Sequence, residues 1–163
     1  MSEPLPPSAA RVQEALRAHN TPFRVVEMPA STRTAPEAAT AIGCSVSQIA
    51  KSILFRGAAT GKPILVIASG TNRVDEKLVA ARAGEPLAKA TADFVRKSTG
   101  YVIGGVPPLG FPQPIETWID ADLLQFSEVW AAAGTPFAVF SLDPNALAGL
   151  TGGTVVQVSR AAS

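Results

Sequence analysis

The sequence predicts an α/β fold, a single compact domain in which short helices surround a mixed, largely antiparallel sheet. The chain has 163 residues, which suits one hydrophobic core, and neither an internal repeat nor a linker divides residues 1–163. The expected strands and helices are short and lack the strand-helix-strand rhythm of a doubly wound parallel sheet. Two apolar strands, 51–56 and 63–69, are joined by a glycine-containing turn, as in an antiparallel hairpin.

The N-terminal elements follow from a capping residue and from proline. Residues 1–7 are rich in proline and are expected to be flexible. Ser8 can cap a helix over residues 9–18, because a serine oxygen accepts a bond from a free N–H of the first turn. The apolar run that follows Pro22 predicts a strand over residues 23–28.

Two capping boxes come next in the chain. Thr34 and Glu37 are three residues apart, which predicts a helix over residues 35–42. Ser45 and Gln48 repeat this spacing and predict a very short helix that leads into the hairpin.

The rest of the chain continues to alternate short helices and strands. Asp75 and Thr91 are capping residues that predict helices over residues 76–82 and 92–98. The other predicted elements are a short helix from Asp143-Pro144 to Leu150 and strands at 87–90, 116–120, 128–132, 137–142 and 154–159.

Charge and hydropathy restrict the class of protein. The formal net charge of +1 argues against a strongly basic protein that wraps nucleic acid, and DNA is not an expected partner. A local basic patch that holds one RNA end remains compatible with it. The apolar runs are too short to cross a bilayer, and residues 1–7 lack the regions of a signal peptide. A cytoplasmic protein is the simplest interpretation.

Few side chains are available for metal or nucleophilic chemistry. Cys44 is the only cysteine and His19 the only histidine, so we expect no disulfide, no metal and no cofactor. His19 near a helix C-terminus is typical of a partner for the helix dipole, and Cys44 of a small packed residue. The sequence also lacks a Gly-x-Ser-x-Gly elbow, a P-loop and a dinucleotide fingerprint. Any catalysis must therefore use lysine, backbone amides, carboxylates or groups of the substrate.

The run from Gly100 to Gly110 is the most distinctive segment of the chain. It reads Gly-Tyr-Val-Ile-Gly-Gly-Val-Pro-Pro-Leu-Gly. Glycine permits positive φ and close approach of the backbone, whereas proline fixes φ and lacks an N–H. The run predicts a rigid loop that presents peptide groups to a ligand. The alternative is a tight connection between two strands.

Lys51 is the strongest charged candidate for a functional residue. Period-two alternation places Lys51, Ile53 and Phe55 on one face of the strand, with Ser52 and Leu54 on the other. Two interpretations remain open for a lysine at the edge of an apolar face. It extends its ammonium into water, or it is a fixed ammonium that binds a phosphate or a polarised carbonyl.

Two further charged segments have a structural and a functional interpretation. Arg73 precedes the helix that Asp75 caps, and its guanidinium either contacts phosphate or is solvated. Asp120 and Asp122 share a face if the segment is extended, which allows an acid/base pair. A cap at the end of the strand is the simpler interpretation for them.

Taken in order, these segments resemble the YbaK/ProX family of aminoacyl-tRNA editing domains. The resemblance spans about residues 12–150 and is carried by the order and spacing of four segments: Ile49 to Phe55, Asn72 to Leu78, Ser98 to Gly110, and Ile119-Asp120. It implies a compact mixed sheet and hydrolysis of the ester between a wrong amino acid and its tRNA. It also implies aminoacyl-tRNA as the partner. The near-neutral net charge suggests modest affinity for tRNA alone, so help from a synthetase or an elongation factor is expected.

The resemblance further implies which residues form the site. The functional lysine of the family falls on Lys51, and its Gly-x-x-x-Pro loop falls on Gly104 to Pro108. The expected catalytic residues are Lys51, Gly104, Gly105 and Pro108. The expected substrate-binding residues are Met28, Ser52, Arg73, Val106, Pro107 and Asp120. An aminoacyl ester is already activated, so its hydrolysis needs a positioned water and charge stabilisation more than a nucleophile.

Two positions depart from the family pattern. Met28 stands near the place of an aromatic residue in several Cys-removing relatives. Pro107 stands where many relatives have Ser, Thr or Cys, and it lacks a hydroxyl. A trans-editing deacylase for a small amino acid on a tRNA(Pro)-type substrate is the leading hypothesis. The alternatives are a non-catalytic module that binds a tRNA end or a synthetase, and a hydrolase of another small acyl ester.

Overall fold

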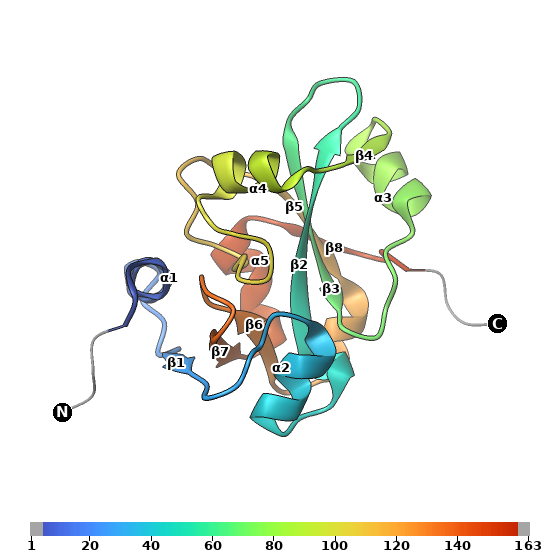
Figure 1. Ribbon diagram of the computed structural model, residues 1–163. Coiled ribbons are helices and arrows are strands. Elements are labelled where there is room, and N and C mark those ends of the chain that lie inside the picture. Colours follow the sequence, from blue (N-terminus) through green and yellow to red (C-terminus); the bar gives the residue numbers. More distant parts are fainter. Residues whose placement is uncertain (1–4, 160–163) are drawn as a thin grey trace.

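A mixed sheet of eight strands organises the computed structural model, which describes residues 5–159 (Figure 1). Its order is β1-β7-β6-β2-β3-β5-β8, and β4 pairs with β2 beside this path. The strands are β1 Val25–Glu27, β2 Ile49–Gly57, β3 Pro63–Ser69, β4 Leu87–Lys89, β5 Glu116–Asp120, β6 Val129–Ala132, β7 Ala138–Leu142 and β8 Thr154–Val156. Antiparallel pairs are β1·β7, β6·β7, β2·β3 and β2·β4, and parallel pairs are β2·β6, β3·β5 and β5·β8. The predicted mixed sheet is confirmed.

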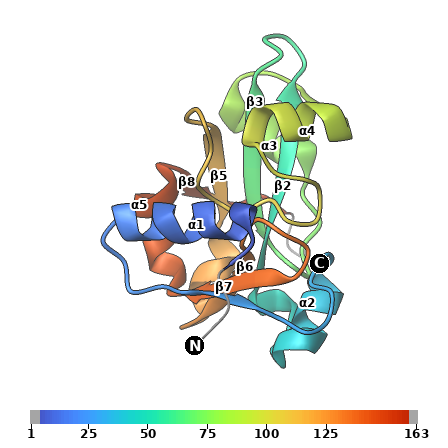
Figure 2. The same ribbon diagram turned by 60° about the vertical axis from the view of Figure 1, so that its left-hand side comes forward.

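Short helices lie around the sheet. They are α1 Pro7–Ala18, α2 Ala35–Ile42, η1 Val46–Gln48, α3 Glu76–Ala83, α4 Ala92–Thr99, η2 Ala121–Gln125, η3 Pro144–Ala146 and α5 Leu147–Thr151. Figure 2 shows α1 crossing in front of the sheet near β6 and β7, with α3 and α4 beside the upper half of β2 and β3. Among residues 5–159, none of these helices has the length and apolar character needed to span a bilayer.

The two faces of the β2–β3 hairpin bury different cores. Leu54 belongs to the main core, which also contains Leu65 of β3 and Leu16 of α1. Phe55, the next residue along β2, packs in a second core with Val79 of α3. The predicted alternation along β2 is therefore confirmed, and burial on both faces fixes its register.

Most predicted caps are confirmed. The Thr34 side chain accepts a hydrogen bond from the Glu37 N–H, and Asp75 and Thr91 cap α3 and α4 in the same way. The expected cap at Ser8 is wrong. Helix α1 already starts at Pro7, because proline is preorganised for the first helical position, and Ser8 lies inside the helix. Residues 1–4 of the segment that we expected to be flexible lie outside the described residues.

Several element boundaries differ from the prediction, and strand pairing explains those of β2 and β8. β2 begins two residues early, because Ile49 pairs with Trp130 of β6 in parallel. β8 is limited to residues 154–156, which pair with β5, so the predicted strand over 154–159 is too long. The predicted helix up to Leu150 consists of η3 followed by α5.

Candidate functional site

The candidate site forms along a stretch of β2 that has a strand neighbour on one edge only. β3 pairs with β2 over Ala50–Arg56. On the opposite edge, β6 pairs with residues 49–50 and β4 with residues 55–57. Within the described part of the chain, residues 51–54 therefore have no strand partner on this edge. The loop between α4 and β5 lies beside β2 instead (Figures 1 and 2).

Two adjoining cavities flank this stretch, with volumes of about 240 and 430 Å³. They share the lining residues Ser52, Ile53, Ile103, Gly104 and Val106. The smaller cavity is completed by Thr32, Arg33, Thr34, Ala35, Ala50, Lys51 and Ala132. The larger is completed by Leu54, Phe55, Glu76, Lys89, Ala90 and Val95. The smaller cavity thus combines two cationic side chains with no carboxylate, and the larger one is mainly apolar.

Lys51 is half-buried and lines the smaller cavity. It is the first residue of the stretch of β2 that lacks a strand partner on one edge. Its Nζ donates a hydrogen bond of 3.3 Å to the carbonyl oxygen of Gly70. Burial lowers the pKa of Lys51 below the usual lysine value, and the nearby Asp120 carboxylate partly opposes this shift. The ammonium is therefore partly desolvated, which strengthens its attraction for an anionic ligand.

Ser52 supplies a polar atom without a protein partner. Its Oγ is buried and makes no hydrogen bond to the described residues. A buried hydroxyl without a partner is unfavourable unless a ligand or a water binds it. Ser52 lines both cavities, and its hydroxyl oxygen is buried beside the place where they meet.

The glycine-proline loop is shaped by close approaches at two glycines. Gly104 has φ +94°, and a Cβ at this position would lie 2.6 Å from Cγ of Arg33. A Cβ on Gly105 would lie 2.9 Å from the backbone of Thr135. The N–H of Gly105 donates to the Val102 carbonyl at 3.0 Å, and its carbonyl accepts from Gly134 N–H at 2.8 Å. Gly105 therefore holds the loop against its neighbour, whereas Gly104 faces both cavities.

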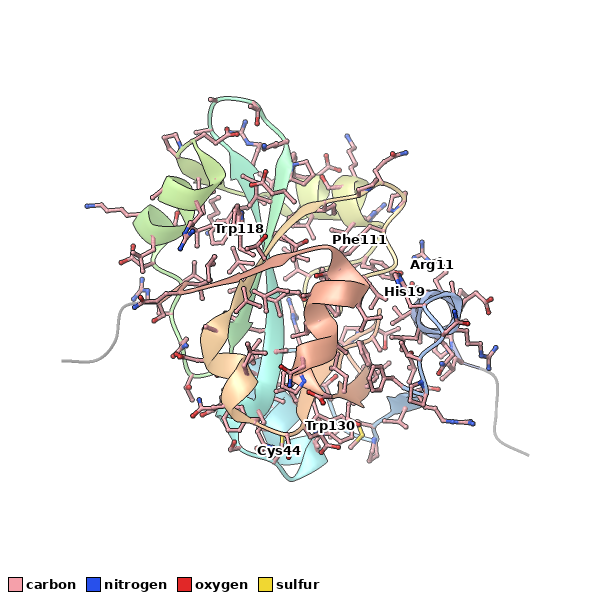
Figure 3. All side chains as sticks on the ribbon, turned by 180° about the vertical axis from the view of Figure 1, so that it is seen from behind. Arg11, His19, Cys44, Phe111, Trp118 and Trp130 are labelled. Carbon is pink, nitrogen blue, oxygen red and sulfur yellow. The ribbon has the colours of Figure 1, made fainter. Side chains whose placement is uncertain are left out.

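Helix α1 and a buried tyrosine fix the base of this loop. Tyr101 is 1% exposed, and its hydroxyl donates to the Gly110 carbonyl at 2.9 Å. The guanidinium of Arg11 lies 4.6 Å from the centre of the Tyr101 ring and donates to the Gly100 carbonyl at 2.9 Å. Figure 3 shows Arg11 on α1, near Phe111, whose ring packs edge-on against Tyr101. These contacts attach the base of the loop to α1 and to its own C-terminal end.

Asp120 lies near Lys51 but inside the protein. It is 2% exposed, and its Oδ2 accepts hydrogen bonds from the Ser69 N–H at 2.9 Å and from Asn72 Nδ2 at 2.8 Å. Its Oδ1 accepts from the Asp122 N–H at 2.9 Å, which is the predicted cap at the strand end. Asp120 therefore joins the ends of β3 and β5, and it acts on Lys51 through its charge.

Six of the expected site residues line neither cavity: Gly105 and Asp120, described above, and Met28, Arg73, Pro107 and Pro108. Met28 donates its N–H to Phe137 and begins the segment that leads to α2. Arg73 lines a separate surface depression beside α3. Pro107 is buried, and Pro108 lines another cavity, on which His19 borders. Of the residues that we expected, the structure brings Lys51, Ser52, Gly104 and Val106 together.

Arg33 and Ile103 are cavity residues that sequence reasoning missed. Ile103 is 50% exposed and lies inside the recognised loop, directly before Gly104. Its place in that loop is the signal that was available. Arg33 lies on an irregular connection, where no periodicity indicates which way a side chain points.

The lone histidine and cysteine lie elsewhere. His19 ends α1, as expected for a partner of the helix dipole. Cys44 packs with Trp130 beside α2, and burial raises the pKa of its thiol (Figure 3). Within residues 5–159, no cluster of His, Cys, Asp and Glu side chains has the composition of a metal site.

The half-buried ammonium of Lys51, the unpartnered hydroxyl of Ser52 and the glycine loop together form a candidate site. The family model of the aminoacyl-tRNA editing domain matches residues 29–150, which include every one of these groups. The chain belongs to this family, and the resemblance noted from the sequence is confirmed.

Individual relatives cover most of the chain. The uncharacterized protein YwhH of Bacillus subtilis is 33% identical over 138 residues, 82% of this chain and 87% of that protein. A candidate Cys-tRNA(Pro)/Cys-tRNA(Cys) deacylase, EbsC of Enterococcus faecalis, is 25% identical over 86% of this chain and 87% of its own length. The crystal structure of a candidate trans-editing enzyme for prolyl tRNA synthetase is 47% identical, with a TM-score of 0.90, and covers 97% of this chain and 100% of that one. The predicted fold class is confirmed by this structural likeness.

Proposed function

We propose that this protein is a trans-editing aminoacyl-tRNA deacylase. It hydrolyses the ester of a small mischarged amino acid, and tRNA(Pro)-type molecules are the substrates that we propose to test before others. The observation that carries the proposal is the meeting of Lys51, the free hydroxyl of Ser52 and the Gly104 backbone at one small cavity. The family and the descriptions of EbsC and of the trans-editing enzyme support the same substrate class.

The proposed reaction needs positioning more than a protein nucleophile. A water attacks the ester carbonyl, a C–O bond to the water forms, and the bond to the terminal ribose oxygen breaks as that oxygen takes a proton. Lys51 holds the phosphate or ribose end of the substrate, and the Gly104 backbone contacts the aminoacyl carbonyl region. By analogy with the family, the free ribose hydroxyl helps activate the water. Removal of one well-aimed donor typically costs about 3 to 4 kcal/mol of transition-state stabilisation.

The size of the smaller cavity fits the purpose of editing. A synthetase pocket discriminates by only about 1 to 3 kcal/mol per methylene, so small amino acids enter sites built for larger ones. The smaller cavity of this protein, with a volume of about 240 Å³, would act as a second site after the synthetase pocket. It would admit only small amino acids and so correct the error by size exclusion. With a net charge of +1 the protein has little general attraction for RNA, so a synthetase or an elongation factor would assist delivery. The site of action is then the cytoplasm.

The rival proposal is a non-catalytic module that binds a tRNA end or a synthetase. It depends on Pro107, which lacks the hydroxyl that many relatives have. Pro107 is buried and lines neither cavity, so the lost hydroxyl removes no group from their walls. This observation favours the enzyme.

A panel of charged tRNAs tests the proposal. Wild-type protein is incubated at low salt with tRNAs that carry Ala, Cys, Ser, Thr or Pro. Hydrolysis of one or two mischarged species above the spontaneous rate supports editing and names the substrate. Binding of the same tRNAs without hydrolysis of any of them would favour the module, and Pro107→Ser would then be the first variant to examine.

A further inference from the structure

We propose that Arg33 is a second cation of the site and binds a phosphodiester of the RNA acceptor end, across the smaller cavity from Lys51. The inference rests on the proposed function, because it assigns the residue that holds the RNA part of the same substrate. Arg33 has no place in the family pattern that we identified in the sequence. Its position is visible only in the folded chain.

The backbone on both sides of Arg33 is fixed. Thr32 is 5% exposed, and its N–H and Oγ1 both donate to the Pro136 carbonyl, at 2.7 and 3.0 Å. The N–H of Arg33 donates to Oγ of Ser31 at 3.2 Å, and Thr34 caps α2. The fixed backbone sets where the side chain begins, whereas the exposed side chain itself still loses rotamer freedom when it binds a ligand.

The side chain of Arg33 extends over the glycine loop. Its Cγ lies 2.6 Å, and its Cδ and Nε each 3.4 Å, from where a Cβ on Gly104 would be. The absence of a side chain on Gly104 therefore leaves the space that the stem of Arg33 occupies. The guanidinium, which carries five N–H donors, forms no hydrogen bond or ion pair with residues 5–159. It is an exposed cation whose donors are unused within the described residues.

The charges around the smaller cavity select the chemistry of the ligand. Among the described residues, Lys51 and Arg33 are the only charged ones that line it, and both are cationic. The amino acid of an aminoacyl-tRNA is itself cationic, because its carboxyl is esterified and its amino group is free. The anions of this substrate are the phosphates of the RNA end. A guanidinium binds phosphate oxygens in a bidentate manner, so Arg33 fits this anion better than a lysine would.

Two substrates separate contact with phosphate from other effects. One is a charged RNA hairpin that ends in CCA, and the other is the same aminoacyl ester on adenosine, which has no phosphate. Arg33→Ala is expected to lower kcat/KM on the hairpin about tenfold, mostly through KM, as for the loss of one charge-assisted contact. On the adenosine ester it should stay within about twofold of wild type, since no phosphate contact exists to lose. Arg33→Lys should recover part of the loss.

A matched control and a salt titration complete the test. Arg56→Ala removes the same charge from an exposed arginine on β2, about 16 Å along the strand from Lys51, and should leave both substrates unaffected. A plot of log kcat/KM on the hairpin against the logarithm of the salt concentration has a negative slope. This slope should become shallower by about 0.7 in Arg33→Ala and should not change in Arg56→Ala. Equal losses on both substrates, or no loss on the hairpin, would overturn the inference.

Failure of the proposed function remains distinguishable from failure of this inference. If wild type hydrolyses neither ester, the affinity for the uncharged CCA-ended hairpin is measured instead. Weaker binding by Arg33→Ala, with unchanged binding by Arg56→Ala, would support the phosphate contact in a non-catalytic module. Equal binding by all three proteins would reject it. Circular dichroism confirms that the variants are folded.

Discussion

Lys51 sets the expected pH dependence of the reaction. Burial lowers its pKa below the usual 10.5, so the folded protein favours the neutral amine relative to the unfolded chain. The contribution of Lys51 to stability therefore increases as pH rises from the lowered pKa to 10.5. Its function needs the ammonium, so activity is expected to change in the opposite direction.

We predict that kcat/KM, after subtraction of the spontaneous hydrolysis rate at every pH, falls on the alkaline side with a midpoint below 10.5. The subtraction is needed because spontaneous ester hydrolysis itself accelerates with hydroxide. A subtracted kcat/KM that stays constant up to pH 10.5 would mean that the charge of Lys51 is not used.

Gly104 is expected to be intolerant of any side chain. Gly104→Ala places a Cβ on a backbone with φ +94° and 2.6 Å from Arg33 Cγ, so we expect a loss of about 1 to 2 kcal/mol in unfolding free energy and at least tenfold in kcat/KM. Gly149→Ala is the control. Nothing lies within 4 Å of its added Cβ, and in α5 it should be neutral or stabilise by up to about 1 kcal/mol. Denaturant unfolding and kinetics of both variants check this, and full activity of Gly104→Ala would contradict it.

The glycine-proline loop depends on its attachment to α1 and on its own tyrosine. Tyr101→Phe removes the bond from the hydroxyl to the Gly110 carbonyl, so we expect a loss of about 1 kcal/mol and a several-fold lower kcat. Arg11→Ala leaves this bond intact and removes only the contacts of the Arg11 side chain with the Tyr101 ring and the Gly100 carbonyl. Its effect on kcat should therefore be smaller. If Tyr101→Phe loses stability but keeps full kcat, the shape of the loop is not what the reaction requires.

The elements were predictable where local chemistry decides them, as at the caps Thr34, Asp75 and Thr91. Lys51 and the glycine loop were recognisable for the same reason, since strand alternation and the properties of glycine and proline are local. Asp120 was ambiguous, because its burial depends on the meeting of β3 and β5. Arg33 was not predictable, since only the folded segment carries it over Gly104.

In the whole molecule, the site results from the way that the sheet is completed. β6 and β4 each pair with only one end of β2, which leaves residues 51–54 open to the loop and to the segment before α2. Both strands were predicted, but their pairing with β2 was not, because local patterns do not indicate which strands pair and β2 and β6 are about 80 positions apart. The sequence thus indicated the parts of the site, and the mixed sheet determines how they meet.

The comparison of wild type with Lys51→Ala on the mischarged tRNA that wild type hydrolyses best is the most direct test. Lys51 is half-buried at the edge of a strand, so the variant should unfold at nearly the same denaturant concentration. We predict that its single-turnover rate falls about 100-fold or more, as for the loss of a well-aimed charged donor. A folded variant that hydrolyses the ester as fast as wild type would contradict the assignment of this site.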